Sequence, residues 1–215
     1  MPMQTWLITG GVACGKSAAL ALLARNLGPE PPFCCDRAAA ALLEDPQMLD
    51  RLSRRFGASV LQCGAEGRAV LDRIALRELV FGDPQARLWL EQQTHPLVLA
   101  ALESARLRAA SDPSQQVFLA EVPLYYEIGA CVPADLVIVV ASSPTVQIRR
   151  LMEQRGLNES TSHRILRSQL PIADKVAHAD VVLWNDGIPQ ALEAQINTLL
   201  LPSATRGRSI LSPSS

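Results

Sequence analysis

A glycine-rich segment near the N-terminus constrains this chain more than any other part of its sequence. Residues 10–17 read GGVACGKS and match the pattern G-x-x-x-x-G-K-[ST]. Residues 5–9 (TWLIT) come before it, and their apolar and β-branched side chains are typical of a buried parallel strand. Residues 17–27 follow as a run of strong helix formers, which Gly28 ends. The sequence therefore predicts a strand, a tight turn and a helix N-terminus in direct succession.

This succession creates a site for phosphate groups. Backbone N–H groups of the turn and the positive end of the helix dipole converge on one place, which favours an anion there. We expect Lys16 to reach the β- and γ-phosphates of a nucleoside triphosphate, and the Ser17 hydroxyl to ligate Mg²⁺. The other nucleotide-binding residues expected in this segment are Gly11, Val12, Ala13, Cys14, Gly15 and Ala18. Cys14 has either a thiol pKa lowered by the helix N-terminus or the role of an inert filler.

Length, charge and cysteine content exclude several other classes of function. The chain has 215 residues and a net charge of −1, so it has one sizeable core and no field to attract nucleic acid or an anionic membrane. Its longest apolar runs, such as residues 136–141, are too short to span a bilayer, and no signal peptide is apparent. The five cysteines are scattered without a C-x-x-C pair, which is typical of a reducing compartment. We expect a soluble, cytoplasmic and monomeric protein.

The remaining sequence predicts a doubly wound α/β fold with five parallel strands. Further strands are expected at residues 31–35, 117–122, 136–141 and 181–184, separated by helical stretches. Residues 37–108 have a helical texture too long for an ordinary crossover, which indicates an inserted helical subdomain. We predict a single domain over residues 1–201 and a disordered tail over 202–215. Its parts are a core (1–35, 115–147 and 179–201), a helical insertion (36–114) and a helical lid (148–178).

Three further residues are candidates for chemistry because of where they fall along the chain. Asp36 and Glu121 follow or end predicted strands, and ligands bind at the carboxyl ends of such strands. Asp36 either orients or deprotonates an acceptor hydroxyl, holds Mg²⁺ through water, or caps the next helix. Glu121 either holds a metal-bound water or pairs with one of the many arginines. Arg155 lies at the end of a basic helix, where a solvated arginine is the ordinary interpretation; the family resemblance described below implies a phosphate clamp there.

Together with a series of shorter segments, these motifs resemble the dephospho-CoA kinase family over roughly residues 5–200. The segments are 56–57 (FG), 71–73 (LDR) with Leu76, 80–81 (VF), 95–96 (HP), 122–124 (VPL) with Glu127, 150–152 (RLM), Gln169, Lys175, 179–180 (AD) and 185–187 (NDG). The resemblance implies a P-loop kinase fold that uses ATP and Mg²⁺. It also implies transfer of the γ-phosphoryl group to the ribose 3′-hydroxyl of dephospho-CoA, which gives CoA and ADP.

The resemblance also distributes roles along the chain. The insertion is expected to hold the acceptor, and the basic helices are expected to close over ATP. The catalytic candidates are Lys16, Asp36 and Arg155. The resemblance also implies that Lys175 and Asn185 lie near the nucleotide. The expected acceptor-binding residues are Asp36, Arg73, Arg77, His95, Leu124 and Glu127. For Arg73 and Arg77 a solvated helix face is the alternative, and for His95 a structural hydrogen bond.

The chain also departs from the family at several positions. The family pattern Asp-x-Asp at the second strand end reads Cys34-Cys35-Asp36 here, so the first carboxylate is a thiol. Gln154 stands where the family has a lid arginine, and Ala40 replaces another arginine. Two loop positions, Ala13 and Ala18, usually hold glycine and threonine. Two alternative functions follow: a degenerate homologue that binds nucleotide or CoA with little catalysis, and a kinase of another small hydroxylic acceptor.

Overall fold

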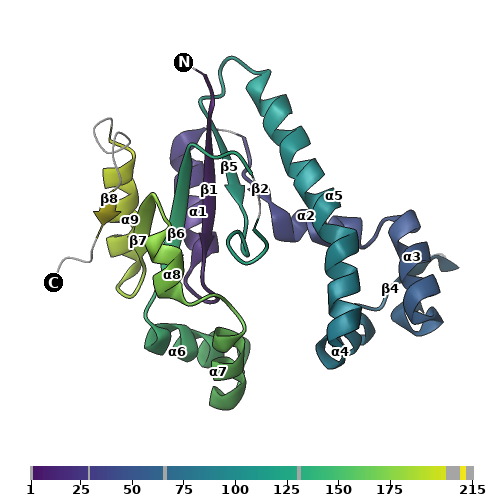
Figure 1. Cartoon of the computed structure of the whole chain (residues 1–215). Coiled ribbons are helices and arrows are strands. Elements are labelled where there is room, and N and C mark those ends of the chain that lie inside the picture. Colours follow the sequence, from purple (N-terminus) through teal and green to yellow (C-terminus); the bar gives the residue numbers. More distant parts are fainter. Residues whose placement is uncertain (1, 29, 65–66, 130–131, 202–208, 212–215) are drawn as a thin grey trace. The chain divides into compact units, whose positions relative to one another are not determined.

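The computed structural model describes residues 2–28, 30–64, 67–129, 132–201 and 209–211, and the description below is confined to them (Figure 1). The chain divides into two compact units. The first comprises residues 1–34 and 105–215 and contains a parallel sheet with its helices, and the second comprises residues 35–104 and is mostly helical. The second unit covers most of the predicted insertion but ends ten residues earlier in the chain than the predicted boundary at residue 114.

The parallel sheet of the first unit has the strand order β2-β5-β1-β6-β7-β8. Its strands are β1 (Gln4–Gly10), β2 (Phe33–Cys34), β5 (Val117–Glu121), β6 (Leu136–Ala141), β7 (Val181–Trp184) and β8 (Ser209–Leu211). The first five are the predicted strands, and each pairs in parallel with its neighbour. The short β8 pairs in parallel with β7. It lies in the predicted disordered tail, so that prediction is wrong for residues 209–211; residues 202–208 and 212–215 lie outside the described part.

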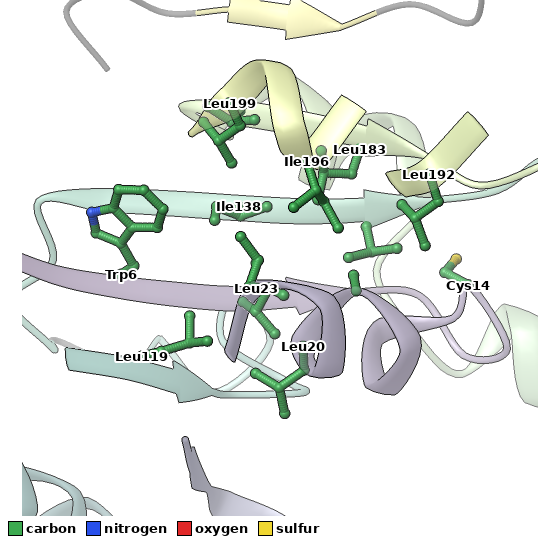
Figure 2. Packing of buried hydrophobic residues seen from close by; sticks show 14 of the residues in the cluster. Trp6, Cys14, Leu20, Leu23, Leu119, Ile138, Leu183, Leu192, Ile196 and Leu199 are labelled. Carbon is green, nitrogen blue, oxygen red and sulfur yellow. The ribbon is translucent and has the colours of Figure 1, made fainter. Parts of the chain in front are cut away.

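Helices cover both faces of this sheet, as alternation along its strands requires. Ile138 and Val140 of β6 belong to a core cluster that includes Leu23 of α1 (Lys16–Leu27) and Ile196 of α9 (Pro189–Leu199). Figure 2 shows the side chains of both helices meeting over the strands. The intervening residues of β6, Val139 and Ala141, pack in a separate cluster with two side chains of α8 (Ile172–Ala177), Ile172 and Val176. The doubly wound architecture is confirmed.

Two helices between β6 and α8 form the predicted lid region together with α8. Helix α6 (Pro144–Arg155) begins at the cap Ser143 and ends at Gly156, which adopts the left-handed conformation with φ 64°. Helix α7 (Glu159–Arg167) is capped by Asn158, whose side chain accepts a hydrogen bond from the Thr161 N–H group. Residues 156–158 therefore form the connection between α6 and α7.

The second unit has its own apolar core, to which Met48, Leu52, Val60, Leu71 and Leu76 contribute. Its elements are α2 (Cys35–Leu42), α3 (Pro46–Phe56), η1 (Ala58–Val60), β3 (Leu61–Cys63), β4 (Ala69–Leu71), α4 (Arg73–Gly82) and most of α5 (Pro84–Ala110). Strands β3 and β4 form an antiparallel pair that the helical texture of the sequence did not predict. Within the described residues, no helix combines the length and the apolar character needed to cross a membrane.

Two helices of the second unit show how a cap and tertiary packing act on the backbone. Helix α4 begins at Arg73, because the Asp72 side chain accepts hydrogen bonds from the N–H groups of Ile74 and Ala75, both at 3.0 Å. Helix α5 continues through Pro96, although proline lacks a backbone donor. Val98 and Ala86, on either side of it, are buried, so packing along the helix offsets the missing bond.

Candidate nucleotide site

The glycine loop joins β1 to α1 in a conformation that only glycine allows at two points. Gly10 has φ 147°, and a Cβ atom there would lie 2.1 Å from the carbonyl oxygen of Val140. Gly15, the cap of α1, has φ 87°, and its Cβ would lie 2.2 Å from the Asn185 amide nitrogen. Ala13 also has a positive φ, 56°. Such alternation of backbone conformation turns successive N–H groups to one side, as an anion-binding loop needs.

Three side chains hold the loop by its carbonyl oxygens. Val12 accepts from Gln147 Nε2 at 2.7 Å, Ala13 from Arg150 Nη1 at 3.1 Å and Cys14 from Asn185 Nδ2 at 2.9 Å. In a trans peptide the C=O and the following N–H point in opposite directions. The N–H groups of residues 13–15 therefore point away from these three side chains, and that of Cys14 meets the Gly11 carbonyl oxygen at 3.4 Å.

Sequence reasoning gave no role to Gln147 or Arg150. Both project from α6, and their i, i+3 spacing places them on one helix face, which was the available signal. Arg150 also donates to the Ser142 hydroxyl at 3.1 Å and to the Asn185 carbonyl at 2.7 Å, so it ties α6, the loop and the end of β7 together. Asn185, expected beside the nucleotide, is buried against the loop and supports it.

The lysine and the serine of the motif, Lys16 and Ser17, lie at the junction of the loop and α1. Lys16 begins α1, and its Nζ donates to the carbonyl oxygen of Gly11 at 2.9 Å and, at 3.4 Å, to that of Gly10. Ser17 follows in the first turn of α1 and is exposed. The Lys16 ammonium and the Ser17 hydroxyl therefore lie at the same end of α1, beside the loop.

Cys14 is the buried cysteine of the loop. Its side chain is fully buried in the core cluster of the sheet, near Leu192 of α9 (Figure 2). Burial raises the pKa of the Cys14 thiol, and the opposing effect of the Lys16 charge is smaller. A thiol pKa lowered by the helix N-terminus is therefore wrong, and the role of an inert filler stays a prediction.

The carboxyl ends of β2 and β5 bring a thiol and a carboxylate together. Cys34 and Glu121 are direct partners in the ladder, and the Cys34 thiol donates to Glu121 Oε2 at 3.5 Å. Glu121 is 7% exposed, and no arginine of the described residues pairs with it. Asp36 is the second residue of α2 and is exposed in the first turn of that helix, in the second unit.

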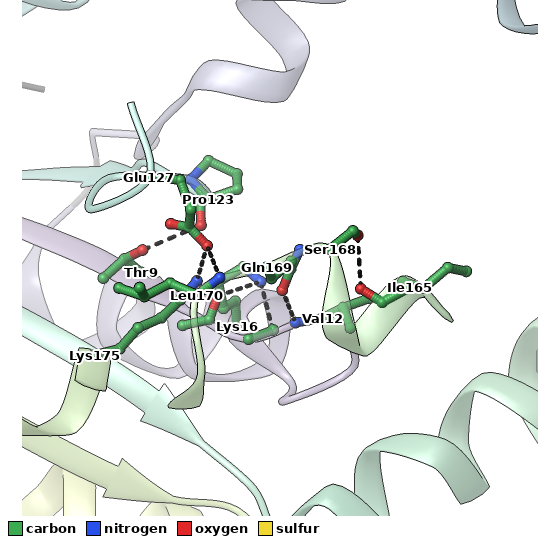
Figure 3. A network of polar contacts seen from close by, with 12 residues as sticks. Thr9, Val12, Lys16, Pro123, Glu127, Ile165, Ser168, Gln169, Leu170 and Lys175 are labelled. Atoms are coloured by element: carbon green, nitrogen blue, oxygen red, sulfur yellow. Dashed lines mark hydrogen bonds and ion pairs between the residues drawn. The ribbon is translucent and has the colours of Figure 1, made fainter. Parts of the chain in front are cut away.

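Glu127 belongs to a buried polar network next to the loop (Figure 3). Its Oε1 atom forms an ion pair with Lys175 Nζ at 2.5 Å and accepts from the Leu170 N–H group at 3.2 Å. The Lys175 side chain is fully buried, and its ammonium is paired with Glu127. The adjacent Gln169 reaches the loop, because its Oε1 accepts from the Val12 N–H group at 2.9 Å.

The other predicted residues are spread over both units. Arg73 and Arg77 are exposed on α4, and Arg73 forms a 2.6 Å ion pair with Glu44. His95 is half-buried within α5, whereas Leu124, which follows β5 in the first unit, is 36% exposed. Arg155 is the exposed last residue of α6.

The described residues contain no group of three or more His, Cys, Asp or Glu side chains suited to hold a metal ion by themselves. A metal at this site would therefore need most of its ligands from a bound phosphate group and from water.

Comparison with protein families gives one match that spans most of the chain. The family model for dephospho-CoA kinase matches residues 6–190. A dephospho-CoA kinase of Anaeromyxobacter dehalogenans is 41% identical over 196 residues, which are 90% of this chain and 89% of the relative. The dephospho-CoA kinase of Syntrophotalea carbinolica is 37% identical over 193 residues, again 90% of this chain and 89% of the relative.

Solved structures agree with this match. A crystal structure from Thermus thermophilus superposes with a TM-score of 0.74 at 31% identity and covers 93% of this chain and 97% of its own. The dephospho-CoA kinase of Campylobacter jejuni superposes with a TM-score of 0.62 at 24% identity, covering 93% and 97%, which shows the shared fold. The P-loop kinase fold predicted from the sequence is confirmed.

Proposed function

The chain belongs to the dephospho-CoA kinase family, and from this premise we propose that it phosphorylates the ribose 3′-hydroxyl of dephospho-CoA. ATP is the phosphoryl donor, and the products are CoA and ADP. One observation carries the proposal: the family match over residues 6–190 coincides with a phosphate-binding loop whose Lys16, Ser17 and backbone supports are all in place. The family, the kinase class and the fold agree on a transfer from nucleoside triphosphate to a small molecule.

The proposed step is an in-line displacement at the γ-phosphorus. A bond forms between the ribose 3′-oxygen and phosphorus, while the bond from phosphorus to the β–γ bridging oxygen breaks. ADP leaves with that electron pair, and the hydroxyl proton passes to the carboxylate of Asp36. Charge spreads over the transferred oxygens, so fixed donors at the loop and the Lys16 ammonium stabilise the transition state more than covalent chemistry does.

The residues at the site fit the Mg²⁺ ion that accompanies ATP in such reactions. The Ser17 hydroxyl is exposed at the start of α1, and the Glu121 carboxylate closes the neighbouring strand, so both offer the hard oxygen atoms that Mg²⁺ prefers. Ser17 would hold the ion directly and Glu121 through water. The ion supplies neutralisation of charge between the β- and γ-phosphates.

The remaining roles follow from the division of the chain. We assign the acceptor to the second unit, with Asp36, Arg73, Arg77 and His95. Leu124 and Glu127 of the first unit stay acceptor-binding candidates from the sequence. Helices α6 to α8 act as the lid, with Arg155 as a phosphate clamp, and exclude water that competes as an acceptor. We propose that the enzyme works in the cytoplasm as a monomer.

A coupled assay tests the function directly. Purified protein with ATP, Mg²⁺ and dephospho-CoA should form CoA and ADP in equal amounts, detected by chromatography and mass spectrometry. Lys16→Met should remove most of this turnover, because no ammonium then faces the phosphates. If folded, ATP-binding protein forms no CoA but phosphorylates a nucleoside monophosphate or shikimate, the acceptor is wrong. If it phosphorylates none of them, the kinase assignment fails.

The thiol at position 34 is the observation that favours the alternative function, a homologue that binds nucleotide or CoA with little catalysis. The Cys34→Asp variant distinguishes this alternative from the kinase. Cys34 donates to Glu121 and cannot itself act as a carboxylate. Because the transition state is loose, assistance by a base contributes little, and we expect Cys34→Asp to change kcat by less than about tenfold. A gain of about a hundredfold in the same assay would show that the native site lacks its base.

A further inference from the structure

We propose that Gln169 is a catalytic residue whose side-chain amide donates hydrogen bonds to the terminal phosphoryl group of ATP. This inference rests on the proposed function only in the identity of the donor nucleotide. Gln169 lies in the short segment between α7 and α8, and sequence reasoning assigned it no role.

The contact with the loop fixes which way the amide faces. The Val12 N–H group can only donate, so the Gln169 atom that it meets at 2.9 Å must be the carbonyl oxygen. The amide nitrogen, with its two N–H donors, is therefore on the other branch of the side chain. The assignment follows from the hydrogen bond itself and not from the shape of the amide.

Those two donors have no acceptor among the residues that the structure describes. Gln169 is half-buried and lines a cavity of about 540 Å³ together with Gly11 of the loop. Lys16 meets the same Gly11–Val12 peptide from its other side, since its Nζ donates to the Gly11 carbonyl at 2.9 Å while Gln169 accepts from the Val12 N–H group. Figure 3 shows both side chains and their separate hydrogen bonds to the loop. A γ-phosphate held by Lys16 is the acceptor that these donors fit.

The segment that carries Gln169 is anchored, so the amide is positioned before ATP binds. The next residue, Leu170, donates its N–H to Glu127 Oε1, which is itself paired with the fully buried Lys175. A donor held in place in advance stabilises developing charge without a cost of reorganisation during the reaction. The position also matters because Gln154 stands where the family pattern has an arginine.

Binding of ATP and ADP separates this role from mere support of the loop. Gln169→Met, nearly equal in volume, removes the donors and one anchor of the Val12 peptide. Gln147→Met removes the hydrogen bond on the other side of the same residue, the 2.7 Å bond to the Val12 carbonyl in the next peptide, and leaves the donors. We expect Gln169→Met to lower the ratio of ATP affinity to ADP affinity about tenfold, as for a hydrogen bond to a charged group. Gln147→Met should weaken both nucleotides alike and keep the ratio.

The control for loss of an amide is Gln195→Met. The Gln195 side chain accepts a hydrogen bond from the backbone N–H group of Trp184 on β7 at 2.9 Å and donates one to its carbonyl oxygen at 2.8 Å. Gln195→Met should leave the affinities for ATP and ADP unchanged. An unchanged ratio in Gln169→Met, or an equal fall of the ratio in Gln147→Met, would overturn the proposal. If Gln169→Met does not fold, Gln169→Asn, with the amide one methylene shorter, gives the same comparison. Calorimetric titration needs no acceptor, so these results stand even if the acceptor proves to be another molecule.

Discussion

At the scale of single residues, the loop shows how burial overrides the helix dipole. Cys14 lies close to a helix N-terminus and to Lys16, yet burial raises the pKa of its thiol. Only the thiolate reacts with an alkylating reagent. We therefore predict that iodoacetamide modifies Cys14 at least about tenfold more slowly than Cys63 at pH 8. Cys63 is exposed and serves as the reference thiol in the same protein.

Peptide mass spectrometry after timed alkylation measures both rates. The Cys14 rate should continue to rise with pH beyond the range in which an ordinary thiol has already titrated, near pH 8.5. Equal rates for the two cysteines at pH 8 would contradict the raised pKa and restore a reactive thiol in the loop.

At the scale of elements, glycine is required in the loop. Comparison of Gly15 in the loop with Gly57 after α3 distinguishes the cost of backbone strain from the cost of a steric clash. Gly15 and Gly57 have nearly the same φ, 87° and 85°. A Cβ at Gly15 would lie 2.2 Å from the Asn185 amide, whereas nothing lies within 4 Å of one at Gly57. We expect Gly15→Ala to lose about 1–2 kcal/mol from left-handed strain. Gly57→Ala should lose about 1–3 kcal/mol, because its ψ of 175° places it in another region that disfavours residues with a Cβ. Only Gly15→Ala should displace Asn185 from Cys14 and lose most of its ATP affinity, as measured by calorimetry.

The polar network around α8 gives a second prediction at this scale. Lys175 is fully buried, and its loss would leave the Glu127 carboxylate buried without its cation. Lys175→Met should therefore lower the free energy of unfolding by about 3 kcal/mol. The double variant Glu127→Gln with Lys175→Met should regain part of this loss, because no unpaired charge remains. Urea unfolding of the three proteins gives the coupling; simply additive losses would show that the pair does not interact.

The elements also show what the sequence can and cannot predict. Strands such as residues 136–141 were predictable because both of their faces are buried and all their residues are apolar. The β3–β4 pair was not, since its three-residue strands are mostly exposed and carry no clear alternation. Pro96 lies inside α5, where a proline alone would favour a break and tertiary packing overrides it. The phosphate loop was evident from its motif, whereas Gln147 and Gln169 lie over a hundred residues away and only folding brings them to Val12.

At the scale of the whole molecule, the division into two units predicts that the two substrates act on different parts of the chain. The loop and its supports lie entirely in residues 1–34 and 105–215, whereas residues 35–104 have a separate apolar core. ATP with Mg²⁺ should therefore slow hydrogen exchange in α1 and α6. At a hundred times its dissociation constant, the stabilisation should reach about 2.7 kcal/mol. Helices α3 and α4 should show little change.

Addition of dephospho-CoA should then slow exchange in α2 and α4, which carry Asp36 and Arg73. The reason is that a ligand protects those amides whose opening must first release it. Exchange followed by mass spectrometry, with ATP alone, dephospho-CoA alone and both, resolves the two units by peptide. Lys16→Met should lose the ATP effect but keep the acceptor effect. Protection by dephospho-CoA confined to the sheet unit would show that the second unit does not hold the acceptor.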